Sequence, residues 1–392
     1  MLFGLDAIPL TEPRAGVGHY TFELARALAA AAPSDEFELA YPSVFPPIDF
    51  DEFSEPLPPN LKPSRVGVGA LGRHWWSVGL PRHVRRRRIR LFHGTNYDVP
   101  LWGGAATVLT IHDLSLVVHP ETHERRRVLR ARRRLPLMAR AANAVVTPTE
   151  SVRREVCEHL GVPASRVFAV PEAARACFTP LKFDETESVR LRVGAGSEFL
   201  LAVGTIEPRK NLPALVEAFE EVVRVRASSR LRLVIAGGRG WMSAPVFEAF
   251  EKSSARASLV IAGYLGDEDL RALYSSCRAF VYPSVYEGFG LPPLEAMSCG
   301  APVVAGRTPA VSEVTAGAAR LFNPRDPSEL ARALVELLDD ARARRELSDA
   351  GLRRAAQFSW QRTARRTLEV YAETLKRRRK GGRMKDKEYK DE

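Results

Sequence analysis

Two glutamates, Glu287 and Glu295, lie eight positions apart in a stretch that also holds glycines, a phenylalanine and two prolines. The apolar run at residues 280–282 before them is typical of a buried strand, and a helical pattern after them stops at Gly300. A glycine loop between a parallel strand and a helix presents backbone N–H groups to anionic ligands. Carboxylates at such a place suit hydroxyl groups instead. The stretch therefore predicts a ligand with both phosphate and hydroxyls.

A basic pair follows another predicted strand of the same half of the chain. Arg209 and Lys210 come shortly after the apolar run at residues 199–203 and just before a helical pattern that begins at Leu212. An arginine fork and a lysine ammonium both bind phosphate oxygens, and a diphosphate would approach this strand end. The alternative is a solvated basic pair on a loop. Beside the two glutamates, the pair favours phosphate binding.

The first predicted helix opens on two glycines. Gly16 and Gly18 follow the apolar run at residues 3–8, and glycines at that position let a backbone approach a phosphate or a sugar. The third glycine of a dinucleotide-binding fingerprint is missing. A plain tight turn therefore explains the pair equally well.

Polar side chains also end two predicted strands of the first half. His112 and Asp113 end one apolar run, and His93 and Asn96 lie at the end of the preceding one. At the carboxyl ends of parallel strands such groups could hydrogen-bond substrate hydroxyls. A structural role for each histidine is the alternative.

The acidic cluster Asp267-Glu268-Asp269 superficially resembles a metal-binding Asp-x-Asp motif. It directly precedes an apolar helical pattern, where the helix dipole favours acids, so we interpret it as a helix N-terminus. The cysteines lack metal-ligand spacing, which indicates free thiols in a reducing compartment. We therefore expect no metal site and no cofactor. The cysteines are Cys157, Cys177, Cys277 and Cys299.

The chain is basic, and the excess is local. Its 392 residues carry a formal net charge of +11, and residues 82–134 alone hold 13 basic and 4 acidic side chains. Arginines that interleave with apolar residues in helical fashion suit an anionic membrane surface or a diphosphate-bearing lipid, with a solvated face as the alternative. No aromatic interleaving supports nucleic-acid binding, which we do not expect. The basic segments are Arg82–Arg90, Arg125–Arg134 and Lys376–Lys380.

The chain also lacks the signals of membrane insertion and export. No run approaches the roughly 18 apolar residues of a transmembrane helix, and the first residues lack the basic and apolar regions of a signal peptide. We therefore expect a cytoplasmic protein whose basic surface suits peripheral attachment to the inner face of the cell membrane.

Short apolar runs alternate with helical patterns in both halves of the chain. This alternation is typical of α/β proteins with parallel, doubly wound sheets. We expect two Rossmann-like domains of similar size that face each other across a cleft, joined by a polar linker.

Together these stretches resemble the retaining glycosyltransferases of family four, which have the GT-B fold. The resemblance runs from Gly4 to Trp360, and its most specific element is the Glu-x7-Glu motif formed by Glu287 and Glu295. The most similar members build bacterial surface polysaccharide, often as mannosyl- or rhamnosyltransferases. Three further segments resemble the family's donor-diphosphate loop, acceptor-side strand end and N-terminal glycine loop: residues 204–211, 110–114 and 16–18.

The resemblance implies a metal-independent hexosyltransferase whose donor substrate is a nucleotide diphosphate sugar and whose acceptor is a glycan or a lipid-linked glycan. It implies that Glu287 binds hydroxyls of the transferred sugar, that Glu295 binds the donor ribose, and that His112 approaches the transferred sugar. Arg209 and Lys210 would stabilise the leaving diphosphate. The remaining donor-binding residues would be Gly16, Gly18, Phe289, Gly290 and Leu291, and the acceptor-side residues His93, Asn96 and Asp113.

The patterns along the chain predict the domain limits, and the resemblance implies the helix that crosses back between the domains. The segments are an N-terminal acceptor-side domain (1–175), a linker (176–196), a C-terminal donor-binding domain (197–358), a helix that crosses back to the N-terminal domain (359–376) and a basic disordered tail (377–392).

Two positions depart from the family pattern. Thr205 stands where many members have an arginine, and His19 replaces a common arginine after the glycine loop. Two other functions stay open at this point: a nucleotide-sugar epimerase on the same fold, and a non-catalytic subunit that binds a sugar or a partner. An epimerase would need further catalytic acids, and the intact set of Glu287, Arg209 and Lys210 disfavours a non-catalytic subunit.

Overall fold

The computed structural model describes residues 1–11, 16–50, 57–69, 74–226 and 230–388, with the side chains of residues 380–388 excepted. The chain folds into two compact units. Unit 1 holds residues 1–114, 131–172 and 359–392, and unit 2 holds residues 115–130 and 173–358. Within the described residues, no helix has the length and apolar character needed to cross a membrane.

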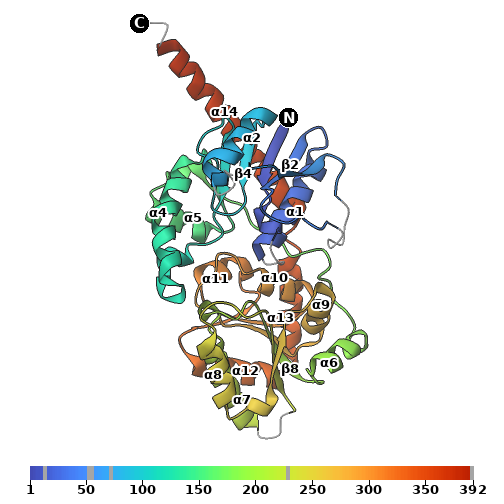
Figure 1. Ribbon diagram of the computed structural model, residues 1–392. Coiled ribbons are helices and arrows are strands. Elements are labelled where there is room, and N and C mark those ends of the chain that lie inside the picture. The colour runs from blue at the N-terminus through green and yellow to red at the C-terminus, as the bar shows by residue number, and fades with distance from the viewer. Residues whose placement is uncertain (12–15, 51–56, 70–73, 227–229, 389–392) are drawn as a thin grey trace. The chain divides into compact units, whose positions relative to one another are not determined.

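Unit 1 contains a parallel sheet of seven strands in the order β3-β2-β1-β4-β5-β6-β7 (Figure 1). Its central strands are buried on both faces, which is why they read as continuous apolar runs in the sequence. The strands are β1 (Leu2–Asp6), β2 (Glu36–Pro42), β3 (Leu61–Val66), β4 (Leu91–Gly94), β5 (Ala106–Thr110), β6 (Ala144–Thr147) and β7 (Val167–Ala169).

Helices lie between several of these strands and provide their parallel crossovers. Helix α5 shows how the sequence sets their limits. The Thr149 hydroxyl accepts a hydrogen bond from the Val152 backbone N–H at its start, and Gly161 ends it in the left-handed conformation. Both ends are thus set by residue types that act locally in the sequence. The α-helices of this stretch of the chain are α1 (Gly16–Ala31), α2 (Leu80–Arg87), α3 (Ser115–Val118), α4 (Arg125–Ala141) and α5 (Glu150–Leu160).

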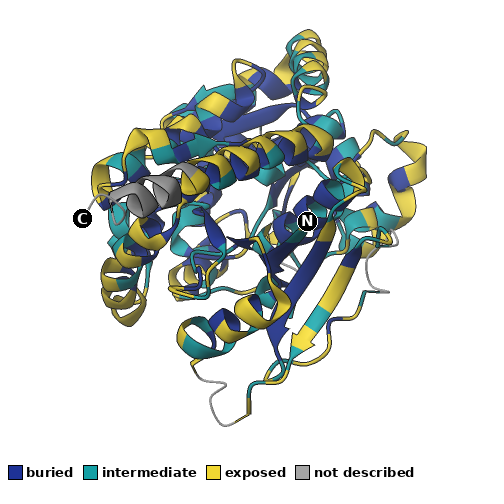
Figure 2. Ribbon diagram, turned by 90° about the horizontal axis from the view of Figure 1, so that it is seen from above, coloured by how far each residue is buried: buried dark blue, intermediate teal, exposed yellow. Residues whose placement is uncertain are grey.

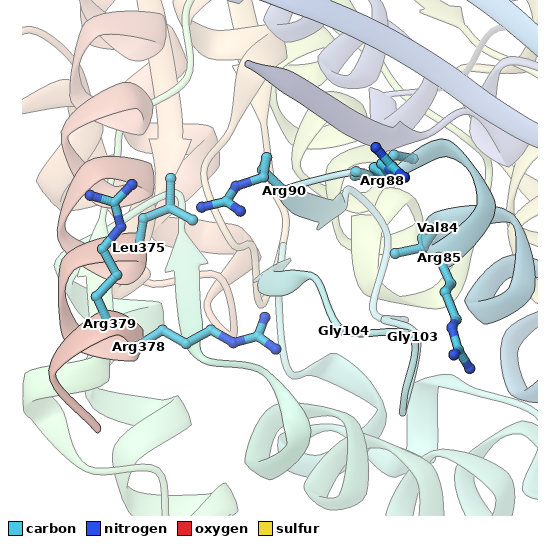
Figure 3. A pocket seen from close by; sticks show the side chains of 10 residues that line it. Val84, Arg85, Arg88, Arg90, Gly103, Gly104, Leu375, Arg378 and Arg379 are labelled. Atoms are coloured by element: carbon cyan, nitrogen blue, oxygen red, sulfur yellow. The ribbon is translucent and has the colours of Figure 1, made fainter. Parts of the chain in front are cut away.

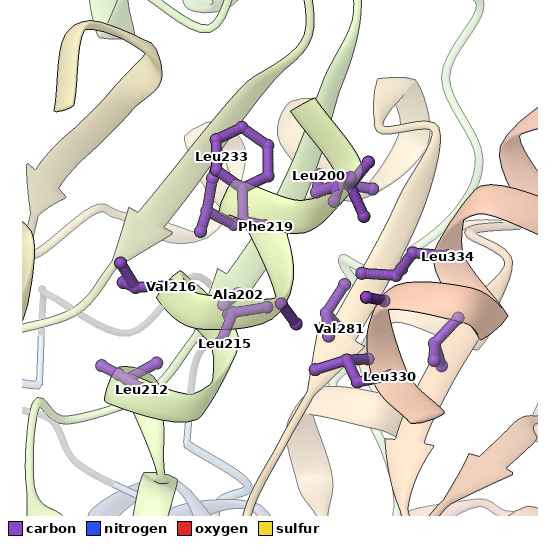
Figure 4. Packing of buried hydrophobic residues seen from close by; sticks show 14 of the residues in the cluster. Leu200, Ala202, Leu212, Leu215, Val216, Phe219, Leu233, Val281, Leu330 and Leu334 are labelled. Atoms are coloured by element: carbon purple, nitrogen blue, oxygen red, sulfur yellow. The ribbon is translucent and has the colours of Figure 1, made fainter. Parts of the chain in front are cut away.

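Unit 2 contains a second parallel sheet, of six strands in the order β10-β9-β8-β11-β12-β13. Its helices include two that share one apolar layer with the sheet. Figure 4 shows Leu215 and Phe219 of α7 packing with Leu200 and Leu233 of the sheet and Leu334 of α12. The strands are β8 (Phe199–Val203), β9 (Arg232–Ala236), β10 (Leu259–Gly263), β11 (Ala279–Tyr282), β12 (Val303–Gly306) and β13 (Arg320–Phe322).

The prediction of two doubly wound α/β domains is therefore confirmed. Figure 2 shows strands that are mostly buried and helices whose surfaces alternate between buried and exposed. The helices of the second half are α6 (Glu187–Val193), α7 (Leu212–Arg226), α8 (Ala244–Lys252), α9 (Asp267–Ser276), α10 (Leu291–Ser298), α11 (Pro309–Thr315), α12 (Pro327–Asp339), α13 (Ala341–Ala355) and α14 (Trp360–Glu388).

The last helix, α14, belongs to unit 1 and is fixed there by a buried polar contact. The Nδ1 atom of His93 lies 2.7 Å from the Tyr371 hydroxyl, and its Nε2 atom lies 2.8 Å from the Thr110 hydroxyl. His93 is fully buried, and burial lowers its pKa to about 3. A neutral imidazole thus ties β4 to β5 and to α14.

Two expected segments differ in the structure. The residues expected to form a linker include α6, which packs on α9 through the Arg192–Asp269 ion pair of 2.6 Å. The polar run at residues 184–187, which suggested a linker, forms a short 3-10 helix (Asp184–Thr186) that leads into α6 at Glu187. Glu185 there accepts a hydrogen bond from the Lys182 backbone N–H.

The prediction of a disordered tail from residue 377 is wrong as far as Glu388, because α14 continues to that residue. Lysine and arginine favour helices and no proline interrupts this part of the chain. Arg377 also pairs with Glu373 one turn earlier and donates a hydrogen bond of 2.7 Å to the Ser165 carbonyl.

Replacing Tyr371 with phenylalanine should destabilise the protein. The change leaves a ring nitrogen of buried His93 without its partner, at a cost of roughly 1–3 kcal/mol in unfolding free energy. Urea unfolding of Tyr371→Phe and of wild type measures this difference in unfolding free energy. Tyr264→Phe is the matched control, because Tyr264 is 62% exposed. Equal stability of the two variants would show that the buried contact contributes nothing.

Candidate active site

The loop after β8 owes its shape to residues with unusual backbone conformations. Gly204 has a φ of +146°, and a Cβ at Gly237 would lie only 2.0 Å from the Gly204 carbonyl oxygen. Asn211 takes the left-handed conformation, with a φ of +53°, just before α7. Its side-chain amide donates hydrogen bonds to the carbonyls of Pro283, at 3.2 Å, and Pro324, at 2.7 Å. The loop is thereby fastened to the neighbouring strand ends of unit 2.

The same fastening brings the basic pair to the first glutamate of the Glu-x7-Glu motif. The Arg209 Nη1 atom lies 3.1 Å from Glu287 Oε2, and the Lys210 Nζ atom lies 2.7 Å from Glu287 Oε1. Lys210 also donates to the Tyr282 hydroxyl at 2.9 Å. Burial alone would raise the pKa of Glu287, but Arg209 and Lys210 outweigh it and lower the pKa to about 2. Glu287 is therefore a buried, ionised carboxylate.

A second carboxylate braces Arg209 from the other side. Glu207 Oε1 accepts hydrogen bonds from Arg209 Nε at 3.2 Å and from Nη2 at 2.8 Å. Glu207 is 1% exposed, and among the described residues its Oε2 atom has no hydrogen-bond partner. Burial raises the pKa of the Glu207 carboxyl, and the negative charge of Glu287 raises it further. Arg209 and Lys210 partly offset this rise. Glu207 fixes the direction of the Arg209 fork.

The second glutamate of the motif belongs to a different group of contacts within unit 2. Arg175 donates to Glu295 Oε1 at 3.2 Å, and the Tyr274 hydroxyl donates to Oε2 at 3.3 Å. Arg175 also pairs with Asp267. Burial raises the pKa of Glu295, and Arg175 lowers it by less. Glu295 is held in place by a cation that sequence analysis did not identify.

The residues between the two glutamates shape the start of α10. Gly290 lies just before the helix with a φ of +99°, and Phe289 packs against Phe358 with ring centroids 5.9 Å apart. Pro292 and Pro293 occupy the first turn and have no backbone N–H. Donors at this helix end must therefore come from Leu291 and the residues before it.

The candidate residues of unit 1 lie in other surroundings. His112 Nε2 donates to the Thr95 carbonyl at 2.8 Å, its Nδ1 faces Glu172 at 3.4 Å, and the ring packs edge-on against Tyr20. The Asp113 backbone N–H donates to the Tyr97 hydroxyl at 3.1 Å. Both follow β5, as the sequence predicted.

The predicted acceptor contact of His93 requires correction. Its two ring nitrogens are occupied by Tyr371 and Thr110, and the side chain has no exposed surface. Asn96 is half-buried after β4, and Gly16 and Gly18 form the first turn of α1. A Cβ at Gly18 would lie 3.0 Å from the Pro9 carbonyl oxygen, so this glycine permits a close approach of α1 to the preceding segment. Residues 12–15 lie outside the described residues.

Four residues of these groups were not identified as site residues in the sequence: Glu207, Arg175, Tyr282 and Asn211. Glu207 and Asn211 lie in the same loop as Arg209, so their position in the sequence could have identified them. Arg175 is far from Glu295 in the chain, and nothing in the sequence connects the two residues. Within the described residues no group of three His, Cys, Asp or Glu side chains could hold a metal ion. The acids at the start of α9 are paired with arginines: Asp267 with Arg175 and Asp269 with Arg192.

The low pKa of Glu287 predicts a pH-dependent stability. A carboxyl whose pKa falls from 4.5 to about 2 on folding stabilises the protein above pH 4.5, and the stabilisation disappears as the pH falls through 2. The unfolding free energy of wild type should exceed that of Glu287→Gln by roughly 3 kcal/mol near neutral pH, and the gap should close with acidification.

Urea unfolding at several pH values measures that gap. Glu268→Gln serves as the control, because Glu268 is exposed on α9 in the same unit. A gap for Glu287→Gln that stays constant from neutral pH to about pH 3 would contradict an ionised, cation-stabilised Glu287.

Comparison with known proteins identifies the family. Residues 183–354 match the family model described as glycosyl transferases group 1, and residues 14–173 match the model of glycosyltransferase family 4. The O-antigen chain mannosyltransferase B of Escherichia coli is 31% identical over 378 residues, which cover 93% of this chain and 97% of that protein.

Two further similarities are narrower. The serotype-specific mannosyltransferase WbdA of Escherichia coli is 32% identical over 60% of this chain, but the match spans only 29% of that larger protein. The crystal structure of HepE from Anabaena in complex with UDP-glucose superposes with a TM-score of 0.73 at 17% identity, covering 95% of this chain and 99% of that one, which shows a shared fold. Family models that match both halves, and a 31% identical relative matched over almost its whole length, show that this chain is a glycosyltransferase of family 4.

Proposed function

We propose that this glycosyltransferase moves a hexose, with mannose favoured, from a nucleotide diphosphate sugar to a glycan or lipid-linked acceptor in polysaccharide biosynthesis, with retention of configuration. The observation that carries the proposal is the contact of Arg209 and Lys210 with Glu287 in unit 2. Two cations and a carboxylate at one point suit a ligand that places phosphate and sugar hydroxyls side by side. The mannosyltransferases among the relatives favour mannose.

The roles follow from the charges. As the bond between the anomeric carbon and the phosphate oxygen breaks, negative charge grows on the leaving diphosphate, and Arg209 and Lys210 would stabilise it. The acceptor hydroxyl attacks from the same face, and its proton passes to the departing phosphate oxygen. Glu287 would then accept hydrogen bonds from hydroxyls of the transferred sugar. Glu207 acts as a positioning residue, because its carboxylate holds the Arg209 guanidinium through two hydrogen bonds.

The other donor contacts are proposed from the family resemblance. Glu295 would bind the ribose hydroxyls of the donor, oriented by Arg175 and Tyr274. Backbone N–H groups of Phe289, Gly290 and Leu291 would meet the sugar and the phosphates. UDP-glucose bound to the HepE neighbour supports a nucleotide sugar as donor.

In unit 1 we propose that Gly16, Gly18 and His112 serve the donor and that Asn96 and Asp113 serve the acceptor. The imidazole of His112 already donates its Nε2 proton to the Thr95 carbonyl. A sugar hydroxyl would therefore have to meet its Nδ1 side, where Glu172 lies. No resident metal or cofactor enters the proposal, because Arg209 and Lys210 would take the charge.

We also propose that the protein works in the cytoplasm and that its basic segments attach it to an anionic membrane surface. The four cysteines are free thiols, as a reducing compartment requires. The exposed arginines of α2, and those of α4 and α14, would meet the lipid headgroups. The segments are Arg82–Arg90, Arg125–Arg134 and Lys376–Lys380.

A donor panel tests the proposed function. The purified protein is incubated with GDP-mannose, UDP-glucose, UDP-galactose and dTDP-rhamnose, and release of the nucleoside diphosphate is measured. We expect GDP-mannose to be turned over fastest, and Glu287→Ala to abolish the release. The folded state of the variant is checked by circular dichroism. Full activity of folded Glu287→Ala would refute the site, and a preference for another donor would refute mannose.

Lys210→Ala should lower kcat by a factor on the order of 10²–10³, because the leaving diphosphate loses a cation placed to meet it. Lys252→Ala is the matched control: this lysine lies on α8 of the same unit, and its only ion pair among the described residues is with Glu248 one turn away. The control should keep wild-type kcat. Unchanged turnover in Lys210→Ala would remove Lys210 from the mechanism.

A further inference from the structure

Unit 1 holds a cavity that the proposed transfer site does not use. It has a volume of about 460 Å³ and is lined by arginines of two helices and of the turn between α2 and β4. Figure 3 shows these side chains around the opening. The arginines are Arg85, Arg88, Arg90, Arg378 and Arg379.

The cavity lies at the amino edge of the unit 1 sheet. Arg90 directly precedes β4, and Gly104, which also lines the cavity, lies two residues before the start of β5. His112 and Asp113 follow β5 at the opposite edge, and the strand residues between them separate the two places by roughly 20 Å. A ligand in the cavity could not take part in the chemistry at the carboxyl edge.

The charge of the cavity is uncompensated. Within the part of the chain that the structure describes, none of its five arginines forms an ion pair, whereas their neighbours Arg87 and Arg377 pair with Glu38 and Glu373. Five guanidinium groups line one opening, and a bound anion would supply the counter-charge that they lack. Arginine forks match phosphate oxygens two at a time, so five arginines suit more than one phosphate group.

The backbone supports this arrangement. Arg88 ends α2 in the left-handed conformation, with a φ of +56°, where glycine is the usual residue. A non-glycine residue in this conformation carries strain of about 1 kcal/mol or more. The conformation turns the chain so that Arg85, Arg88 and Arg90 all line the cavity.

Two exposed apolar residues come directly before a residue that lines the cavity. Leu101 and Trp102 are each 47% exposed and directly precede Gly103, another lining residue. The Trp102 indole donates a hydrogen bond of 2.7 Å to the Ser77 carbonyl, which fixes the ring at the surface. Exposed tryptophan and leucine next to arginines are typical of a surface that enters the headgroup region of a membrane.

We propose that this cavity binds the headgroup of an anionic lipid that carries two phosphate groups. The five arginines would hold the phosphates while Leu101 and Trp102 enter the adjacent apolar layer. This inference rests on the proposed membrane attachment but not on the proposed transfer reaction. The proposal places the membrane contact of the basic segments at one defined site rather than across a diffuse charged surface.

Vesicle flotation of the full chain tests the site. One set of phosphatidylcholine vesicles contains cardiolipin, which carries two phosphates, and a second set contains phosphatidylglycerol at equal total charge. Wild type should bind the cardiolipin vesicles more tightly, and Arg90→Gln/Arg378→Gln should weaken that binding by roughly tenfold or more. Donor turnover of this double variant on a soluble acceptor should equal that of wild type, which separates this test from that of the transferase.

The matched control is Arg154→Gln/Arg365→Gln, which removes the same charge from exposed positions of unit 1 outside the cavity. It should bind cardiolipin vesicles within about twofold of wild type. Equal losses in both double variants would overturn the proposal in favour of diffuse charge. Saturable binding of inorganic pyrophosphate without binding to either vesicle would overturn the lipid and assign the cavity to a soluble polyphosphate.

Discussion

A buried carboxylate keeps its charge only where cations stand against it, and the candidate site of unit 2 depends on that constraint. Glu287 lies almost wholly out of water, and its ionisation rests on Arg209 and Lys210. In turn the two cations are held in one position by the carboxylate, with Glu207 fixing the arginine fork. A buried ion pair carries a desolvation penalty for both charges. Removing one partner leaves the other as an unpaired buried charge. The charges of Glu287, Arg209 and Lys210 thus hold one another in a fixed arrangement.

The backbone makes this charge cluster possible. Asn211 and Gly204 adopt conformations that ordinary side chains resist, and the Asn211 amide ties the loop after β8 to the carbonyls of Pro283 and Pro324. The loop after β8 and the loop after β11 therefore form one body within unit 2. A parallel sheet supplies the frame, because all its strands end at one edge and deliver their loops to the same place.

Unit 1 divides its polar residues between the two edges of its sheet. At the carboxyl edge, His112 and Asp113 stand among aromatic rings and backbone carbonyls, while His93 has become part of the core and holds α14. At the amino edge the arginines of α2 and α14 surround an open cavity. Extension of α14 beyond the expected end at residue 376 brings Arg378 and Arg379 into that cavity.

The sequence by itself determined the two doubly wound sheets and the Glu287–Arg209–Lys210 candidates, because buried strands and glycine loops are local patterns. It also placed His112 and Asp113 correctly at a strand end. Only the tertiary structure decided that Arg175 supports Glu295, that His93 is a core residue, that the expected linker contains α6, and that five arginines share a cavity. Each of these depends on residues far apart in the chain, and burial or charge pairing between distant segments leaves no periodic signal in a sequence.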